Sequence, residues 1–332
     1  MKIVVDAMGT DDRPVADVAG AVLAAKEFKD TMILIGDEKQ IKAELAKHDT
    51  SNLSIEVVHA EDEIGMGDKP SKVMKSKPNS PMHIGMNLVK EGQADAFVSA
   101  GNTGATHAIA TLSTLRRIAG IKRPALTGIY PVGDTNMIMV DVGANADCKV
   151  EWLEQFAIMG DIYAKSVFNV TSPTIGTLSN GEEEGKGNQL TRDAQERIRQ
   201  LNLNYIGHVE PKELLSGSVD VVVMDGFVGN IFIKTFEGAV SYLTGNIRKQ
   251  IRADVISTMG GLLARGAFKR LRDEIDPREV GGAPLLGVNG VVIVAHGGSD
   301  AYEIRSAIRQ ARLAVEGNVV EEIRQALATV SA

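Results

Sequence analysis

Short apolar runs alternate with longer amphipathic stretches along most of the chain. The first run, residues 3–5, predicts a buried strand, and residues 15–28 have the apolar spacing of a helix. Further strands are predicted at residues 32–35, 53–58, 96–99, 126–130, 137–140, 174–178, 219–224 and 291–295. Apolar strands separated by helices, such as the helix predicted at 152–167, are typical of a mostly parallel sheet covered on both faces. The pattern therefore predicts the α/β fold class, as one unit over residues 1–332.

The stretch 236–278 departs from this alternation. Apolar residues recur there every three or four positions without a strand-like run, which predicts helix. Gly260 and Gly261 interrupt the pattern, so we expect a helical hairpin that turns at these glycines. Seven basic residues and one acidic residue lie between Arg248 and Arg272. They form either a solvated face beside a dimer contact or a binding surface for an anionic partner.

Composition excludes several classes of protein. Hydrophobic residues make up 44% and charged residues 24% of the 332 residues, which is ordinary for a folded globular chain. The formal net charge of −7 argues against a nucleic-acid partner. The single cysteine allows no intrachain disulfide and fits a reducing cytosol. The N-terminal residues do not resemble a signal peptide, and no apolar stretch approaches the roughly 18 residues of a membrane-spanning helix.

Glycine accompanies Asn, Asp, Ser or Thr where several predicted strands end. These loops are 101–104, 141–145, 179–181, 225–230 and 296–299, and a similar loop, 287–290, precedes the last strand. In open α/β sheets, ligands bind at the carboxyl ends of strands. Backbone N–H groups of glycine and neutral side-chain donors can hold an anion there. Glycine and asparagine also serve simply as turn residues, but five such loops favour a phosphate-sized anion site.

Familiar catalytic motifs are missing. No G-x-G-x-x-G follows the first strand, and the loop 181–187 departs from a P-loop because Gly187 stands where Ser or Thr would bind magnesium. No G-x-S-x-G motif is present, and Cys148, the only thiol, is either a reactive group or a small packed residue. We expect no cofactor and no metal, although Asp6, Asp141 and Asp225 end strands and could instead hold magnesium.

Six segments, in consistent order, resemble the phosphate acyltransferases of bacterial phospholipid synthesis. The segments are VDAMGTDDRP (5–14), SAGNTGA (99–105), DVGANADCKVEWLEQFA (141–157), LSNGEEEGKGN (178–188), MDGFVGNIFIKTFEG (224–238) and LLGVNGVVIVAHGGSDA (285–301). The resemblance implies a three-layer α/β/α sandwich related to phosphate acetyltransferases and to isocitrate and isopropylmalate dehydrogenases. It implies transfer of a fatty acyl group from acyl-[acyl-carrier-protein] to phosphate.

The resemblance also implies partners and a location. Members of the family are homodimers in the cytoplasm that associate peripherally with the inner face of the cell membrane. They supply acyl phosphate to a membrane glycerol-3-phosphate acyltransferase. The basic hairpin at 236–278 matches the family's dimer-forming, membrane-facing bundle, and would meet both acyl carrier protein and an anionic membrane surface. Contacts there are expected from Arg248, Arg252, Leu262, Leu263, Arg265, Lys269 and Arg270.

The implied chemistry asks little of the protein. Phosphate has a second pKa of about 6–7 and is largely dianionic without an enzyme base. A thiol with a pKa of about 8.5 is a good leaving group, so no covalent enzyme intermediate is needed. The protein then has to position the two substrates and stabilise the oxyanion that forms during the reaction. We assign catalytic roles to Lys186, Asn102, Asn230 and Asp225. Phosphate or substrate binding is assigned to Gly101, Thr103, Gly104, Asp141, Asn145, Asn180 and Asn289.

Three alternatives differ in what they require. A short-chain phosphate acyltransferase that uses acyl-coenzyme A shares the fold and the chemistry, but needs no apolar acyl channel. A metal- and NAD-dependent decarboxylating dehydrogenase needs an arginine cluster near the glycine loops, and the sequence shows none there. A non-catalytic membrane scaffold has no use for five polar loops at strand ends.

Overall fold

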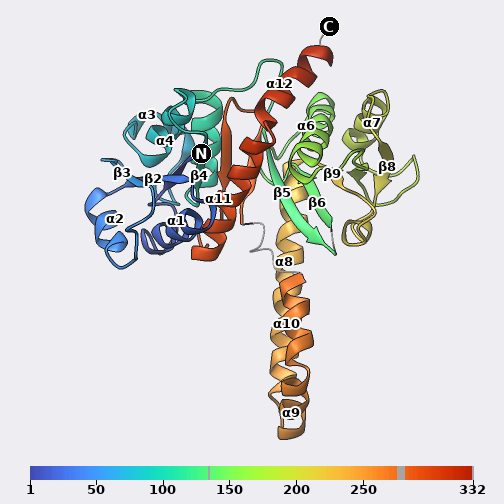
Figure 1. Cartoon of the computed structure of the whole chain (residues 1–332). Helices are drawn as coiled ribbons and strands as arrows, with labels where there is room; N and C mark the ends of the chain where they lie inside the picture. Colours follow the sequence, from blue (N-terminus) through green and yellow to red (C-terminus); the bar gives the residue numbers. More distant parts are fainter. Residues whose placement is uncertain (134, 275–280, 331–332) are drawn as a thin grey trace.

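The computed structural model describes residues 1–133, 135–274 and 281–330. Within these residues the strands form one eleven-stranded sheet, in the order β3-β2-β1-β4-β11-β10-β5-β6-β9-β7-β8 (Figure 1). The strands are β1 (Lys2–Asp6), β2 (Thr31–Gly36), β3 (Ile55–His59), β4 (Ala96–Ser99), β5 (Ala125–Val132), β6 (Thr135–Val140), β7 (Ile175–Leu178), β8 (Tyr205–Val209), β9 (Val221–Val223), β10 (Ala283–Leu286) and β11 (Val291–Val294).

Helices cover both faces of the sheet. The helices are α1 (Val15–Phe28), α2 (Glu38–Leu45), α3 (Pro70–Ser76), α4 (Pro81–Lys90), α5 (Thr103–Ala108), α6 (Val150–Phe168), α7 (Gln189–Ile198), α8 (Gly226–Ile251), α9 (Val255–Leu263), α10 (Arg265–Glu274), α11 (Ala301–Glu316) and α12 (Val319–Val330). In the first half of the sheet, α1 and α11 bury apolar residues on one face, and α4 and α5 do so on the other. In the second half, α6, α7 and α12 pack on one face and α8 on the other. The predicted three-layer α/β/α architecture is confirmed.

The two halves of the sheet run in opposite directions. Strands β1, β2, β3, β4 and β11 are parallel to one another, as are β6, β7, β8 and β9. Between the two sets, β10 pairs antiparallel with both β11 and β5, and β5 pairs antiparallel with β6. These three antiparallel steps place the carboxyl ends of the two sets at opposite edges of the sheet. The loops that follow the first set of strands therefore lie at the opposite edge of the sheet from the loops that follow the second set.

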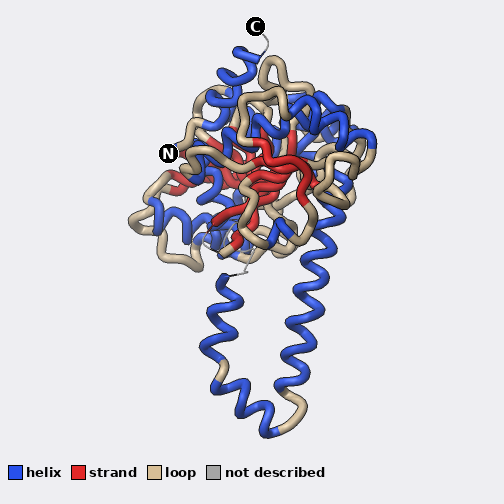
Figure 2. The backbone as a smooth tube through the Cα atoms, turned by 90° about the vertical axis from the view of Figure 1, so that its right-hand side faces the viewer, coloured by secondary structure: helices blue, strands red, loops and turns tan. Residues whose placement is uncertain are grey.

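The hairpin exists, but its turn lies elsewhere. Helix α8 continues beyond the sheet, α10 returns towards it, and α9 forms the tip (Figures 1 and 2). Helix α8 ends at Ile251, and Asp254 begins α9 by accepting a 2.8 Å hydrogen bond from the Ser257 amide. Gly260 and Gly261 lie inside α9, and the break after the long helix falls at residues 252–254 instead of at the glycine pair. The predicted end of the hairpin, 275–278, lies outside the described residues.

Among the described helices, none combines the length and the apolar character that crossing a bilayer requires.

Candidate active site

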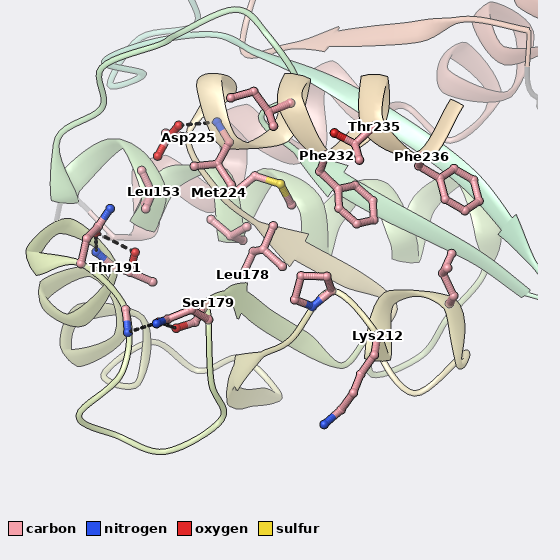
Figure 3. Close-up of a pocket in the computed structure, with 18 of the residues that line it drawn as sticks. Leu153, Leu178, Ser179, Thr191, Lys212, Met224, Asp225, Phe232, Thr235 and Phe236 are labelled. Atoms are coloured by element: carbon pink, nitrogen blue, oxygen red, sulfur yellow. Dashed lines mark hydrogen bonds between the residues drawn. The ribbon is translucent and has the colours of Figure 1, made fainter. Parts of the chain in front are cut away.

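A groove lies between the first turns of α8 and the loops that follow β7 and β8. Its volume is about 970 Å³, at the upper end of the range typical of small-molecule sites. Figure 3 shows Phe232 and Phe236 projecting from α8 into the groove, with Lys212 extending along the opposite rim. Most of the wall is apolar, and Leu178 and Leu215 line it together with the side chains of α8. Polar lining residues are Ser179, Asn180, Asn188, Thr191, Lys212, Asp225 and Thr235.

The start of α8 fixes one end of the groove. The Asp225 carboxylate accepts a 2.8 Å hydrogen bond from the amide of Val228, and so caps the helix. Asp225 also lines the groove, and its predicted catalytic role stays a prediction. Asn230, one turn further along α8, donates from Nδ2 to the carbonyl of Val142 at 3.3 Å. Asn230 therefore ties the helix to the loop after β6.

Asp141 and Asn145 organise that loop. The buried Asp141 carboxylate accepts hydrogen bonds from the amides of Leu126, Gly143, Ala144 and Asn145, and from Asn145 Nδ2. Burial raises the pKa of Asp141, against the opposing effect of these hydrogen bonds. Asn145 Nδ2 also donates to the Pro124 carbonyl at 2.8 Å. Both side chains hold the loop beneath α8 and do not line the groove.

The loop after β7 borders the groove on another side. Asn180 Oδ1 accepts a 2.9 Å hydrogen bond from the Gly187 amide, which closes the loop 180–187, and both residues line the groove. Lys186 belongs to the same loop. Its side chain is about half exposed, at 49%, with Nζ 4.0 Å from Glu183 Oε2, and it is not part of the groove wall.

The Asn102 loop lies at the opposite edge of the sheet, after β4. Asn102 Oδ1 caps α5 through the Ala105 amide at 3.0 Å, and its Nδ2 donates to the carbonyls of Gly65, Met66 and Asp68. The side chain thus serves the local structure. Thr103 and Gly104 are exposed at the start of α5, whereas Gly101 is buried. These four predicted residues therefore form a second polar loop, separate from the groove.

Asn289 is also placed apart from the groove. It precedes β11, and its Nδ2 donates to the carbonyls of Leu115, Arg116 and Arg117, while its Oδ1 accepts from Arg324. Asn289 thus joins the β10–β11 connection to residues 115–117 and α12, and its expected contact with substrate stays a prediction.

Sequence reasoning missed the apolar wall of α8 and four polar lining residues, Asn188, Thr191, Lys212 and Thr235. Asn188 caps α7 through the Thr191 amide at 2.9 Å, which a helix-start pattern could have indicated. Lys212 follows β8, a strand that was not predicted. Cys148 is partly buried, and burial raises the pKa of its thiol to about 12, which makes it a poor nucleophile. In the part of the chain that the structure describes, no group of three or more His, Cys, Asp and Glu residues is placed to hold a metal ion.

Comparison with known proteins shows the family. A family model described as "Fatty acid synthesis protein" matches residues 1–322. A curated phosphate acyltransferase from Trichlorobacter lovleyi is 46% identical over 327 residues, which cover 98% of this chain and 94% of that protein. The chain belongs to the phosphate acyltransferase family. A second member, from Pelobacter propionicus, is 45% identical over 327 residues, with coverage of 98% and 94%. The chain is thus an acyltransferase that transfers an acyl group to phosphate in fatty-acid and lipid synthesis.

Solved structures agree on the fold. A phosphotransacetylase from Streptococcus pyogenes superposes with a TM-score of 0.62 at 18% identity, covering 97% of this chain and 94% of that one. A putative 4-hydroxythreonine-4-phosphate dehydrogenase from Salmonella typhimurium gives 0.52 at 14% identity, with coverage of 94% and 98%. The fold is therefore shared between acyl-transfer enzymes and dehydrogenases, and family membership sets aside both the dehydrogenase and the scaffold alternatives.

Proposed function

We propose that this phosphate acyltransferase takes a long fatty acyl group from acyl-[acyl-carrier-protein] and forms acyl phosphate for phosphatidic acid synthesis. The groove carries this proposal. Its apolar wall continues along α8 from Val228 to Ala239, and each methylene buried there contributes about 0.8 kcal/mol. An acetyl group would leave most of the wall around Phe232 and Phe236 uncovered. The wall therefore favours a long-chain donor over the short-chain acyl-coenzyme A alternative.

The reaction needs no enzyme nucleophile. A phosphate oxygen attacks the thioester carbonyl carbon, the carbon–sulfur bond breaks, and the thiolate leaves and takes up a proton. The raised pKa of Cys148 supports direct attack. Catalysis then rests on donors placed around the developing oxyanion. Asn180, at the polar end of the groove, is the proposed donor, and Lys186 in the adjoining loop is the proposed cation for phosphate or for the leaving thiolate.

Other assigned residues have supporting roles in this proposal. Asp225, Asn230, Asp141 and Asn145 fix the start of α8 against the loop after β6, and so position the groove wall. Gly101, Asn102, Thr103 and Gly104 remain a candidate phosphate-binding loop at the other edge of the sheet. The proposed reaction uses neither a cofactor nor a metal.

The hairpin is the proposed contact surface for partners. Arg248, Arg252, Arg265, Lys269 and Arg270 are exposed on it. At the tip, Leu262 is 66% and Leu263 90% exposed. Basic side chains beside exposed leucines suit both the acidic carrier protein and an anionic lipid surface. The exposed Tyr242 and Leu243 on the stem are the proposed homodimer contact. We propose a cytoplasmic enzyme held at the inner face of the membrane, which passes acyl phosphate to a glycerol-3-phosphate acyltransferase.

One assay tests the donor. The purified protein is incubated with phosphate and either palmitoyl-[acyl carrier protein] or acetyl-coenzyme A, and both thiol release and acyl phosphate are measured. We expect phosphate-dependent turnover with the long-chain carrier substrate and little with acetyl-coenzyme A. Faster turnover of acetyl-coenzyme A would refute the proposed donor.

A pair of variants tests the groove itself. Ala239 lines its far end, whereas Gly238, its neighbour on α8, would meet nothing within 4 Å on gaining a side chain. Ala239→Phe should shift the preference from palmitoyl towards shorter acyl groups. Gly238→Phe adds the same bulk outside the groove, and should leave the chain-length profile unchanged. An unaltered profile in Ala239→Phe would show that the acyl chain lies elsewhere.

A further inference from the structure

Lys212 is the only basic residue in the wall of the groove, within the residues that the structure describes. It stands just beyond the end of β8, next to Pro211, and its side chain is 70% exposed along the rim (Figure 3). Asp225, an acidic residue of the wall, already accepts a hydrogen bond from the Val228 amide. The groove thus has a cation at its rim and apolar side chains along its length.

Two carboxylates hold the ammonium group in place. Lys212 Nζ lies 2.7 Å from Glu210 Oε2 and 3.3 Å from Glu182 Oε1. Glu210 directly follows β8, whereas Glu182 belongs to the loop after β7, so the second contact bridges two rims of the groove. Hydrogen bonds to both carboxylates raise the pKa of Lys212, and the residue is fully charged at neutral pH.

The Glu182 contact is the exchangeable one. Glu182 is 53% exposed, against 28% for Glu210, and ion pairs between exposed side chains contribute little to stability. A phosphate dianion carries twice the charge of a carboxylate, and an ammonium group has three donors to offer it. Phosphate can therefore replace Glu182, while Glu210 keeps Lys212 at the rim.

The polar neighbours fit the same ligand. Ser179, Asn180 and Asn188 line the groove, and their neutral side chains can donate to phosphate oxygens. A fatty acyl chain bound along α8 would place an anionic head group next to these residues. We propose that Lys212 binds the phosphate group of the groove's ligand, in exchange for Glu182. This inference rests on the proposed function, and deepens it by naming the residue that recognises the phosphate.

Direct binding measurements test the exchange. Decyl phosphate and decanol, which share the chain and differ in the head group, are titrated calorimetrically into the full-length protein and three variants. Lys212→Met should weaken the binding of decyl phosphate at least tenfold and leave the affinity for decanol unchanged. Glu182→Gln, which removes the competing carboxylate, should strengthen the binding of decyl phosphate. Arg199→Met is the matched control, because Arg199 pairs with Glu184 of the same loop at 2.6 Å and does not line the groove; both affinities should stay at the wild-type values.

The outcomes separate the two proposals. If decanol fails to bind the wild-type protein, the groove is not an acyl site, and the proposed function fails together with this inference. If decanol binds and Lys212→Met binds decyl phosphate as tightly as wild type, only the assignment of Lys212 is overturned.

The phosphate could belong to the acceptor or to the phosphopantetheine arm of the carrier. Steady-state kinetics of Lys212→Met distinguish these sources. A raised KM for inorganic phosphate, with S-decanoyl-phosphopantetheine unaffected, assigns Lys212 to the acceptor. A raised KM for S-decanoyl-phosphopantetheine alone assigns it to the carrier arm. An unchanged KM for both would contradict the proposal.

Discussion

The amide of Gly226 donates a 2.8 Å hydrogen bond to the backbone carbonyl of Asn145. This bond joins the first residue of α8 to the loop after β6. A Cβ atom on Gly226 would stand 2.8 Å from that same carbonyl oxygen, so the close approach of the two backbones requires glycine here. The orientation of α8, and with it the wall of the groove, depends on this contact.

Gly229→Ala tests how tightly α8 is seated. A Cβ at this position would lie 2.1 Å from the Asp141 carbonyl oxygen, which is backbone and cannot rotate away. We expect the free energy of unfolding to fall by about 1–3 kcal/mol, as for other overpacked sites, and long-chain turnover to fall with it. Chemical denaturation monitored by circular dichroism measures the change.

The control for this variant lies on the same helix. Gly238→Ala meets nothing within 4 Å, and alanine is favoured over glycine in a helix by roughly 1 kcal/mol. Its stability should equal or exceed that of the wild type. A denaturation midpoint for Gly229→Ala equal to that of Gly238→Ala would contradict the tight seating of α8.

Local patterns predicted most elements of the fold. The predicted helix at 15–28 and the predicted strand at 96–99 coincide with α1 and β4, since their apolar spacing is set within a few residues. Strand β10 was missed because its four residues include Pro284, and β8 because Gly207 and His208 interrupt its apolar run. The direction of the strands in the second half of the sheet could not be deduced from the sequence. It depends on β10 returning from far along the chain to pair between β11 and β5.

The candidate site was harder to predict, for a physical reason. An asparagine amide both donates and accepts, so it suits a ligand and a neighbouring backbone equally well. The side-chain amides of Asn102 and Asn289 each donate hydrogen bonds to three backbone carbonyls. These carbonyls lie far from the two asparagines in sequence. Asn180 is the predicted asparagine that reaches the groove. Only the tertiary structure decides which partner is close.

Lys186→Ala tests the proposed catalytic cation. Loss of one donor to the transition state lowers turnover by about 10²-fold in other enzymes, and we expect a fall of that size in kcat. The free energy of unfolding should stay within about 0.5 kcal/mol of the wild type, because the side chain is exposed. Steady-state thiol release and thermal denaturation measure the two effects. Wild-type kcat in a folded variant would remove Lys186 from the mechanism.

Asp17 gives the stability a pH dependence. Its side chain is buried, Thr10 Oγ1 donates to it at 2.6 Å, and burial raises its pKa from 3.8 to about 7. Between these two values the folded protein holds a proton that the unfolded chain has lost. Stability therefore falls as the pH rises from 4 to 7, by at most about 1.4 kcal/mol per pH unit from this group, and levels off above pH 7.

Asp17→Asn should flatten that decline. Urea denaturation at pH 4, 5, 6, 7 and 8 gives the difference between wild type and variant. Asp49→Asn serves as the control, because Asp49 is exposed and hydrogen bonds from Ser51 lower its pKa. The contribution of Asp49 to stability therefore rises with pH, opposite to that of Asp17, and changes only in acid. Parallel curves for the wild type and Asp17→Asn would show that this carboxyl group has an ordinary pKa.

The hairpin makes the last prediction, which separates charge from apolar insertion. Each basic residue near an anionic membrane contributes about 1 kcal/mol, and each leucine fully buried in the interface adds roughly 1.5–3 kcal/mol. Because α9 forms the tip, the exposed Leu262 and Leu263 can enter the interface while the stem stays outside it. The double variant Leu262→Glu/Leu263→Glu should abolish co-sedimentation with vesicles of anionic phospholipid, and should leave turnover with soluble acyl carrier protein nearly intact.

Charge reversal should act differently from this double variant. The triple variant Arg265→Glu/Lys269→Glu/Arg270→Glu should raise the KM for the carrier substrate and weaken vesicle binding most at low salt, where screening is least. Gln200→Glu is the matched control, since it adds a negative charge at an exposed position after α7, outside the hairpin. Vesicle binding equal to the wild type in both multiple variants would exclude the hairpin as the membrane contact. Loss in the leucine variant alone would show that insertion, rather than charge, holds the protein at the surface.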